Sequence, residues 1–390
     1  MIFKHSKIYS CFCLTLITFS CCELFAETTP LNKDAILFAS LPSPQQIPSQ
    51  KTGSTHPDVK WQDSPRASVK KGFTTHASFL YWQAREDRLE YAETVDSGFV
   101  QDIIRSKAKI DKLHFEWNPG FQVGLGYIFP EKEQWDFALN WTSFYSKAHG
   151  SAEKRDPNFI GHSIRPLWFS VLTGAFVDKA SAHWTVHYNV LDLSLARSYY
   201  VGRFLIIKPL LGIRGAWIDQ HYLAKYHAIY PNDPLVFNNN KFKADNDYAG
   251  VGLRLGSDLR WPISPHFSLV GNISGSVLYG AFRIHERING FFQTTNILIR
   301  EIFKEAEHLH RLNVNLESKI GLQWQTFFHR NRFRVCIGAF YDFSYWFNQN
   351  QLVNQIAVLD PVAITRILGV ERNDGDLQLQ GGRLEICFEF

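Results

Sequence analysis

Cysteine is nearly absent from the part of this sequence that we expect to remain after export. Four of the six cysteines, Cys11, Cys13, Cys21 and Cys22, lie within the first 26 residues. Only Cys336 and Cys387 follow, and two cysteines do not make a disulfide framework. The sequence therefore excludes the class of small secreted domains that disulfides hold together.

Long hydrophobic runs are also scarce. The one candidate, residues 8–22, is too short and too rich in Ser, Thr and Cys to span a bilayer. Lys4 and Lys7 precede it and Ala26 follows it at an approximate cleavage site, which is typical of a secretory signal peptide. We therefore predict a signal peptide over residues 1–26, with a lipoprotein signal ending at Cys21 as the alternative, and exclude a helical membrane protein.

Neither the charge nor the motifs indicate a nucleic-acid partner or a chemical step. The formal net charge is only +4, so we expect no nucleic-acid binding. Nucleophile motifs and Gly-rich phosphate loops of the usual spacing are missing. His308 and His310 are two residues apart, but no third metal ligand is evident. We therefore predict that the protein is not an enzyme and holds no cofactor and no metal.

Aromatic residues and strict alternation are what the sequence has in abundance. Phe, Tyr and Trp reach 15% of the chain, and rings at a membrane–water interface would explain this load. In the last nine residues, one strand face would carry Leu384, Ile386, Phe388 and Phe390, opposite Arg383 and two glutamates. A chain that ends on an aromatic residue after such a period of two is typical of the closing strand of an outer-membrane barrel.

The same alternation recurs through much of the chain. It is clearest in residues 311–325 and recurs in 135–145, 211–217, 251–261 and 333–347. Strands of about 10 to 15 residues fit a membrane better than a soluble β-sandwich, whose strands average about five or six residues. At Val190-Leu191 the apolar phase reverses, which predicts a β-bulge.

Connections of two lengths separate these segments. Long ones cover residues 85–109, 147–180, 223–246, 285–308 and 348–376, and short ones cover 131–133, 201–203, 262–266 and 329–332. Outer-membrane barrels combine long outer loops with short periplasmic turns. Over residues 71–390 we therefore predict an all-β fold, a transmembrane antiparallel up-and-down β-barrel of about 10–12 strands, with both termini periplasmic. Residues 27–70, rich in Pro, Ser and Gln, are expected to be a disordered periplasmic linker.

Several segments also resemble a known family. They are residues 79–92, 117–127, 188–193, 214–220 and 375–377, together with the terminal strand. From about residue 75 to the end, the chain is similar to the major-outer-membrane-protein-like barrels of chlamydia-related bacteria, akin to the Legionella-type major outer membrane protein family. The resemblance implies a surface-exposed outer-membrane barrel with porin activity and without catalytic residues. Arg88 departs from the pattern, which has Gly at this position.

The inward positions of the predicted strands carry charges of both signs, which favours a water-filled lumen. The predicted pore-lining residues are Asp136, Asn140, Arg214, Arg254, Asp258, Arg260, Glu317, Lys319, Arg334, Asp342, Arg383 and Glu385. The predicted membrane girdle on the outward face comprises Trp135, Trp141, Trp217, Trp261, Trp324, Tyr345 and Phe390.

The leading hypothesis for function is a porin that passes small hydrophilic solutes passively and also has an envelope-structural role. The first alternative is a non-conducting structural or adhesin-like barrel, in which the inward charges pair and long outer loops bind host partners. The second alternative, which we rank last, is a barrel enzyme with carboxylates or histidines at its outer rim.

The two late cysteines form a testable pair. If Phe333 lies opposite Phe390 in the last hairpin, Cys336 and Cys387 face each other. An oxidising compartment favours a disulfide between them, and two free thiols are the alternative. The partners expected for such a barrel are outer-membrane lipid, the barrel-assembly machinery acting on the C-terminal strand, and further copies of the chain in a homo-oligomer.

Overall fold

The computed structural model describes residues 72–100, 103–129, 135–154, 162–168, 177–201, 205–227, 239–292, 297–328, 333–359 and 366–390. The predicted signal peptide, 1–26, and the predicted linker, 27–70, lie outside these ranges. Within the described ranges, the structure contains no helix that is long and apolar enough to cross a membrane.

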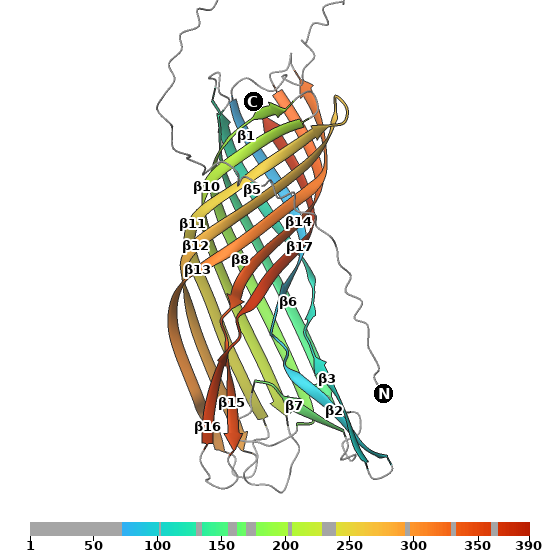
Figure 1. The fold of residues 1–390 in the computed structure, drawn as a ribbon, viewed down its shortest axis with the longest axis vertical. Coiled ribbons are helices and arrows are strands. Elements are labelled where there is room, and N and C mark those ends of the chain that lie inside the picture. The colour runs from blue at the N-terminus through green and yellow to red at the C-terminus, as the bar shows by residue number, and fades with distance from the viewer. Residues whose placement is uncertain are drawn as a thin grey trace, which may run out of the picture. The chain divides into compact units, whose positions relative to one another are not determined.

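Ten long strands close into one antiparallel barrel (Figure 1). They are β1 (Gly72–Glu86), β5 (Trp117–Ile128), β6 (Trp135–Glu153), β8 (Lys179–Arg197), β10 (Leu205–His227), β11 (Asn239–Pro262), β12 (Phe267–Phe292), β13 (Ile297–Phe328), β14 (Phe333–Asn350) and β17 (Gly375–Glu389). Each strand pairs with the next in this order, and β17 pairs with β1 to close the ring. The predicted all-β, up-and-down barrel is therefore confirmed, with ten strands in its wall among the described residues.

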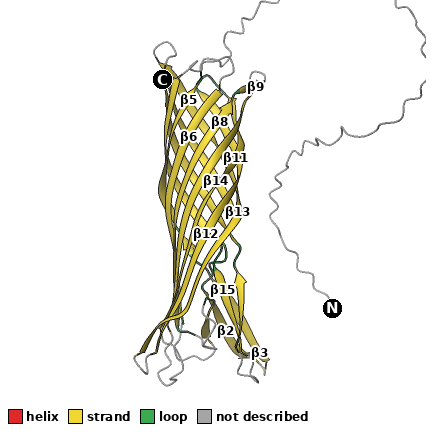
Figure 2. Ribbon diagram, turned by 90° about the vertical axis from the view of Figure 1, so that its left-hand side faces the viewer, coloured by secondary structure: helices red, strands yellow, loops and turns green. Residues whose placement is uncertain are grey.

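The two ends of the barrel differ in their connections. At one end the C-terminal residue Phe390 exchanges backbone hydrogen bonds with Phe73, and the connections are short. The short strands β4 (His114–Phe115) and β9 (Tyr199–Val201) join the barrel wall. Two small sheets follow at the other end, one of β2 (Ala92–Val100), β3 (Ile103–Asp111) and β7 (His162–Pro166), the other of β15 (Val353–Leu359) and β16 (Arg366–Arg372) (Figure 2). We refer to these two ends as the turn end and the loop end.

Several predicted loops are shorter than expected because the strands continue into them. The predicted connection 285–308 is mostly strand, since β12 runs to Phe292 and β13 begins at Ile297. β13 alone has 32 residues. A tilted strand needs only about 9–11 residues to cross the hydrocarbon core of a bilayer. The barrel is therefore much longer than a membrane is thick.

The outward face of the barrel changes its chemistry along the strands. On β11 the outward side chains Leu253 and Val251 are 64% and 59% exposed. Further toward the loop end, the outward positions of the same strand hold Asp247, Asp245 and Lys243. We name the apolar outer surface the belt. The part of the barrel that carries the belt is called the belt half, and the part between the belt and the loop end is called the extension.

The inward face changes in the opposite sense at the same level. On β12 the inward side chains are Ser274 and Ser276 in the belt half, and then Leu278, Phe282 and Ile284 in the extension, all of them buried. Similar residues from the other strands join one hydrophobic core cluster inside the extension. The belt half is therefore polar inside and apolar outside, whereas the extension is packed like a water-soluble protein.

The reversal of apolar phase at Val190-Leu191 is a consequence of this change and not of a bulge. The pairing of β8 with β6 and with β10 passes through both residues without a register shift. Val190 points inward and is 1% exposed, while Leu191 points outward and is 38% exposed. The predicted bulge is wrong, because the residue types change sides where the interior becomes apolar while the backbone continues its regular pleat.

Candidate functional site

The interior of the belt half encloses a polar cavity of about 410 Å³. All twelve residues predicted to line a pore line this cavity: Asp136, Asn140, Arg214, Arg254, Asp258, Arg260, Glu317, Lys319, Arg334, Asp342, Arg383 and Glu385. They come from β6, β10, β11, β13, β14 and β17, so the cavity touches most of the barrel wall. The period-two pattern of the sequence thus places the inward side chains correctly.

Asp192, Lys208 and His76 also line the cavity and were missed in the sequence. Asp192 lies next to the phase reversal in β8, where the assumed bulge obscured which face is inside. Lys208 precedes Pro209, at the start of an alternating segment, and His76 lies in a strand whose faces the sequence pattern left unassigned. Closer attention to the continuous alternation of β8 would have found Asp192.

A network of four charges crosses the interior where the belt half meets the extension. The guanidinium group of Arg214, which is 2% exposed, donates to both carboxylate oxygens of Asp192 at 2.6 and 2.8 Å and of Glu317 at 2.7 and 2.8 Å. Arg254 donates to the same two carboxylates at 3.1 Å each. Two guanidinium groups therefore neutralise two carboxylates that come from β8 and β13, which satisfies the requirement that buried charges be paired.

Polar side chains complete the first network. The amide oxygen of Asn315 accepts a hydrogen bond from Arg214, and its amide nitrogen donates to the hydroxyl group of Ser344 at 3.0 Å. The hydroxyl group of Ser274 accepts a hydrogen bond from Arg254 at 3.0 Å. The Arg214 network and its hydrogen-bonded neighbours thus come from β8, β10, β11, β12, β13 and β14, and they link strands on several sides of the lumen.

A second group of paired charges lies across the remaining strands. Arg383 donates to the Asp342 carboxylate at 2.7 Å and lies 3.9 Å from that of Glu385. Lys319 lies 3.6 Å from Glu385, and Arg383 also donates to the amide oxygen of Gln122. Most of the charged residues that were predicted to line a pore therefore bind one another.

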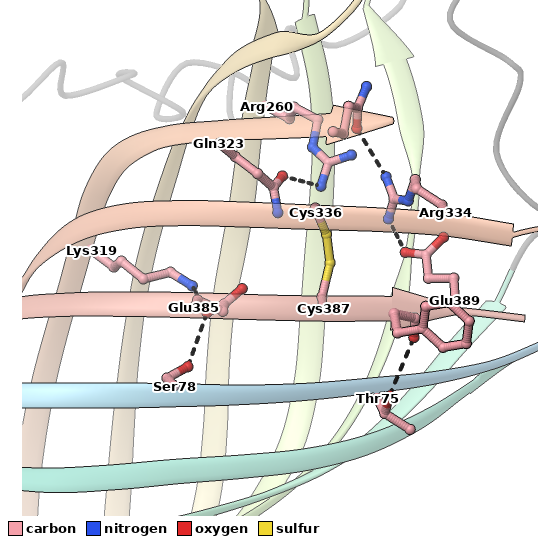
Figure 3. The surroundings of a disulfide bond; sticks show 12 residues. Thr75, Ser78, Arg260, Lys319, Gln323, Arg334, Cys336, Glu385, Cys387 and Glu389 are labelled. Carbon is pink, nitrogen blue, oxygen red and sulfur yellow. Dashed lines mark hydrogen bonds and ion pairs between the residues drawn. A yellow bond between two sulfur atoms is a disulfide. The ribbon is translucent and has the colours of Figure 1, made fainter. Parts of the chain in front are cut away.

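Near the turn end Cys387 lines the cavity. Figure 3 shows it together with Cys336 and the neighbouring side chains. Cys336 and Cys387 are register partners in β14 and β17 and form a disulfide, with their Cα atoms 5.0 Å apart. The register assumed from the sequence is the one observed. Arg334 and Glu389 form an ion pair beside the disulfide, and Arg260 donates to Gln323 at 2.9 Å.

Beyond the charge network, aromatic side chains fill the lumen of the extension. Trp184 and Trp346 are both 0% exposed, and Tyr188 and Tyr248 pack against the Trp346 ring with centroids 6.0 and 6.4 Å apart. The indole nitrogen of Trp184 donates to the Gln220 side chain at 3.1 Å. Closely packed interiors of this kind leave few voids as large as a water molecule.

The chain also folds inward at the loop end, where β14 ends. Gln349 and Gln351 are 0% exposed. Asn246 of β11 donates to the backbone oxygen of Gln349 at 2.8 Å, and the backbone nitrogen of Val353 donates to Glu286 of β12 at 2.7 Å. We refer to residues 349–353 as the inner strap, because hydrogen bonds hold this segment against the inner wall.

One buried carboxyl group of the extension lacks an ion-pair partner among the described residues. Glu86 is 3% exposed and accepts a hydrogen bond from the Gln220 amide at 3.4 Å. Burial, together with the negative charges of Asp87 and Asp376, raises the pKa of Glu86 well above its ordinary value. The protonated form of Glu86 is therefore favoured more than that of an ordinary glutamate.

The residues predicted as a membrane girdle lie on outward positions of the wall: Trp135, Trp141, Trp217, Trp261, Trp324, Tyr345 and Phe390. Trp217, Trp261 and Phe390 are 47%, 57% and 45% exposed. Their contact with lipid headgroups stays a prediction. In the part of the chain that is described, no group of three or more His, Cys, Asp or Glu side chains is placed to hold a metal ion.

Several solved structures are similar to this chain, though at low identity. The outer membrane protease OmpT of Escherichia coli shares 7% identity, with 82% of this chain and 96% of that chain covered and a TM-score of 0.36. A major outer membrane protein of Thermus thermophilus shares 11% identity, with 80% and 99% covered and a TM-score of 0.24. The toluene transporter TodX of P. putida shares 9%, with 84% and 92% covered and a TM-score of 0.26. Such scores are too low to support an argument about function.

No curated protein matches the chain. One family model does match, and it is described as Legionella pneumophila major outer membrane protein precursor. The match covers residues 65–390, which include the whole barrel. The resemblance drawn from the sequence is thereby confirmed, and the belt on the outer face agrees with it. The chain therefore belongs to the Legionella major outer membrane protein family and is an outer-membrane β-barrel.

Proposed function

We propose that this protein is a non-conducting structural barrel of the outer membrane, with both termini in the periplasm and the extension outside the cell. One observation carries the proposal: beyond the Arg214 network, aromatic and aliphatic side chains form a buried core cluster across the lumen, and the polar side chains among them, such as Gln220 and Asn246, are buried and hydrogen-bonded. Trp184 and Trp346, both fully buried, lie in that filled part. A passive pore needs a continuous aqueous path, and a packed apolar core excludes water from it.

The orientation follows from the connections. In outer-membrane barrels the short turns face the periplasm and the longer connections face outward. Here the short connections lie at the end of Phe390, and the β2–β3–β7 and β15–β16 sheets lie at the other. A membrane-impermeant amine reagent applied to intact cells should therefore modify Lys241 and Lys243 of the extension. If it modifies them only after the outer membrane is broken, the orientation is the reverse.

A passive porin remains the second candidate, because the belt half holds a polar cavity of about 410 Å³. Planar-bilayer recordings separate the two. Refolded protein that shifts on unheated gels and floats with liposomes should give no discrete openings. Reproducible single-channel steps from the same preparation would establish the porin and overturn the closed barrel.

Two tryptophan variants make the recording decisive. Trp184→Gly combined with Trp346→Gly removes the two largest fully buried side chains of the filled lumen and should introduce a measurable leak. Trp217→Gly removes an outward tryptophan from the same barrel and should leave the protein silent. If the inward pair is as silent as the outward control while still folded, another barrier closes the lumen.

A further inference from the structure

The outer face of the extension carries a group of four exposed cations on three adjacent strands. Lys225 lies on β10, Lys241 and Lys243 on β11, and Arg287 on β12, all at outward positions. We name these four residues the basic patch. Among the described residues, none of the four has an acidic partner within ion-pair distance, which leaves their charges directed at solvent.

The register of the sheet sets like charges directly opposite each other. Lys225 is the partner of Lys241 across β10 and β11, and Lys243 is the partner of Arg287 across β11 and β12. Opposite residues of an antiparallel pair have Cβ atoms about 4.5–5.5 Å apart, and like charges in that position destabilise the sheet. Lys241 and Lys243 are two residues apart on one face, about 7 Å. Four positive charges therefore share a surface about 10 Å across. Their mutual repulsion lowers the stability of the folded barrel.

Other cations of the extension lie within ion-pair distance of a carboxylate. Lys147 lies 3.5 Å from Glu116, Lys179 lies 3.2 Å from Glu153, and Arg372 lies 2.6 Å from Glu307. On the same strands as the patch, Arg283 is the register partner of Asp247. The basic patch thus stands apart from a surface on which the described cations generally have acidic neighbours.

The height of the basic patch argues against lipid phosphates as its ligand. Lys225, Lys243 and Arg287 each lie eight residues beyond the last large apolar residue of the belt on their strand, which are Trp217, Val251 and Tyr279. At about 3.3 Å per residue and a tilt of about 35–45°, this places the patch roughly 20 Å beyond the belt.

Carboxylates stand between the belt and the basic patch, where Arg283 is the one Lys or Arg at an outward position of these three strands. On β10 and β11 the outward positions nearest to the belt are Asp219 and Asp247, which are register partners, and Asp245 follows. Burial raises the pKa of Asp247, and the carboxylates of Asp219 and Asp245 raise it further, against the opposing effect of Arg283 and His285. Three carboxylates against one guanidinium group make this level less favourable for lipid phosphates than the basic patch itself.

We propose that the basic patch binds a linear sulfated polysaccharide outside the membrane. Sulfate groups keep their charge at all physiological pH values, and their spacing along a chain lets several of them meet four cations within about 10 Å of one another. Binding would remove the repulsion between Lys225 and Lys241 and between Lys243 and Arg287. The inference depends on the proposed orientation and is independent of whether the lumen conducts.

Heparin is the probe that tests the patch. Immobilised heparin should retain purified protein in detergent, with affinity falling on the order of a hundredfold between 50 and 200 mM NaCl, as the release of counterions by four cations requires. Lys241→Gln with Lys243→Gln should weaken binding about tenfold. The matched control, Lys147→Gln with Lys179→Gln, removes the same charge from ion-paired positions and should stay within twofold of the wild type.

Three results would overturn the proposal: no retention of the wild type, an equal loss in the two double variants, or patch-dependent binding to vesicles with lipopolysaccharide but not to heparin. The melting temperature should not fall in the patch variant, since it relieves repulsion, so a folding defect is recognisable. In purified protein both ends of the barrel are accessible to heparin. The binding test therefore does not depend on the orientation of the barrel in the outer membrane. Heparin binding to intact cells that the patch variant loses would support both together.

Discussion

Replacing Arg214 with Met tests whether the charge network stabilises the barrel. The variant loses four hydrogen bonds of 2.6 to 2.8 Å to Asp192 and Glu317 and leaves two buried carboxylates with one guanidinium group. Breaking a buried ion pair by removing one partner costs about 3–5 kcal/mol. Since Arg254 still contacts both carboxylates at 3.1 Å, we expect a loss of about 3 kcal/mol, at the lower end of that range.

Urea unfolding in lipid vesicles, followed by tryptophan fluorescence and by the gel shift, measures this loss. With a slope of roughly 2–3 kcal/mol per M, the midpoint should fall by roughly 1–1.5 M. Lys208→Met is the control, because Lys208 pairs with Asp136 near the turn end and the two side chains are 27% and 17% exposed. Its loss should stay below about 1 kcal/mol after screening by water.

A compensating variant sharpens the same test. Glu317→Gln, combined with Arg214→Met, leaves one cation, Arg254, facing one anion, Asp192, and should recover part of the lost stability. The reasoning about buried charge is refuted if Arg214→Met costs no more than Lys208→Met, or if the second substitution recovers nothing.

Three further predictions concern other parts of the barrel. Because the pKa of Glu86 is raised in the folded state, its protonated form contributes stability that is fully present below the ordinary value of 4.5 and is lost as the pH rises through the raised pKa. Glu86→Gln should therefore gain stability relative to the wild type as the pH rises from 4.5 to 8. Equal urea midpoints for the variant and the wild type at both pH values would contradict this. Thiol labelling of denatured, unreduced protein should find neither Cys336 nor Cys387, and Cys387→Ser should cost about 2–4 kcal/mol; full labelling would rule the disulfide out. A Cβ at Gly252 would meet the Val277 backbone oxygen at 1.9 Å, so Gly252→Ala should cost about 1–3 kcal/mol, whereas Gly382→Ala, with nothing within 4 Å, should be silent in the same melt.

The sequence predicts the faces of the strands well because alternation is a local property. The last hairpin is an example: its register, and with it the facing of Cys336 and Cys387, follows from matching two short alternating segments. The twelve inward polar residues were likewise found from the period of two alone. Local pattern is enough where the side chains of one face share one environment.

What the sequence pattern missed depends on the environment of each face and on contacts across the lumen. Alternation says that Val190 and Leu191 point to opposite sides, but not that the inside turns apolar at that level. Charges and histidines made residues 285–308 resemble a loop, although residues 285–292 and 297–308 lie on strands beyond the belt. The pairing of Arg214 with Glu317 joins residues 103 positions apart, and no local pattern indicates it.

The extension has a consequence for how the barrel reaches its place. In the proposed orientation its outward charges, including Lys225, Lys241, Lys243 and Arg287, must travel through the hydrocarbon before they emerge on the far side. Lys or Arg on the lipid face at the bilayer midplane is unfavourable by about 2–4 kcal/mol each, so these four alone raise the barrier by roughly 8–16 kcal/mol if they cross together. Unassisted insertion would then be extremely slow, and a catalyst that thins or opens the bilayer becomes a kinetic requirement for this chain.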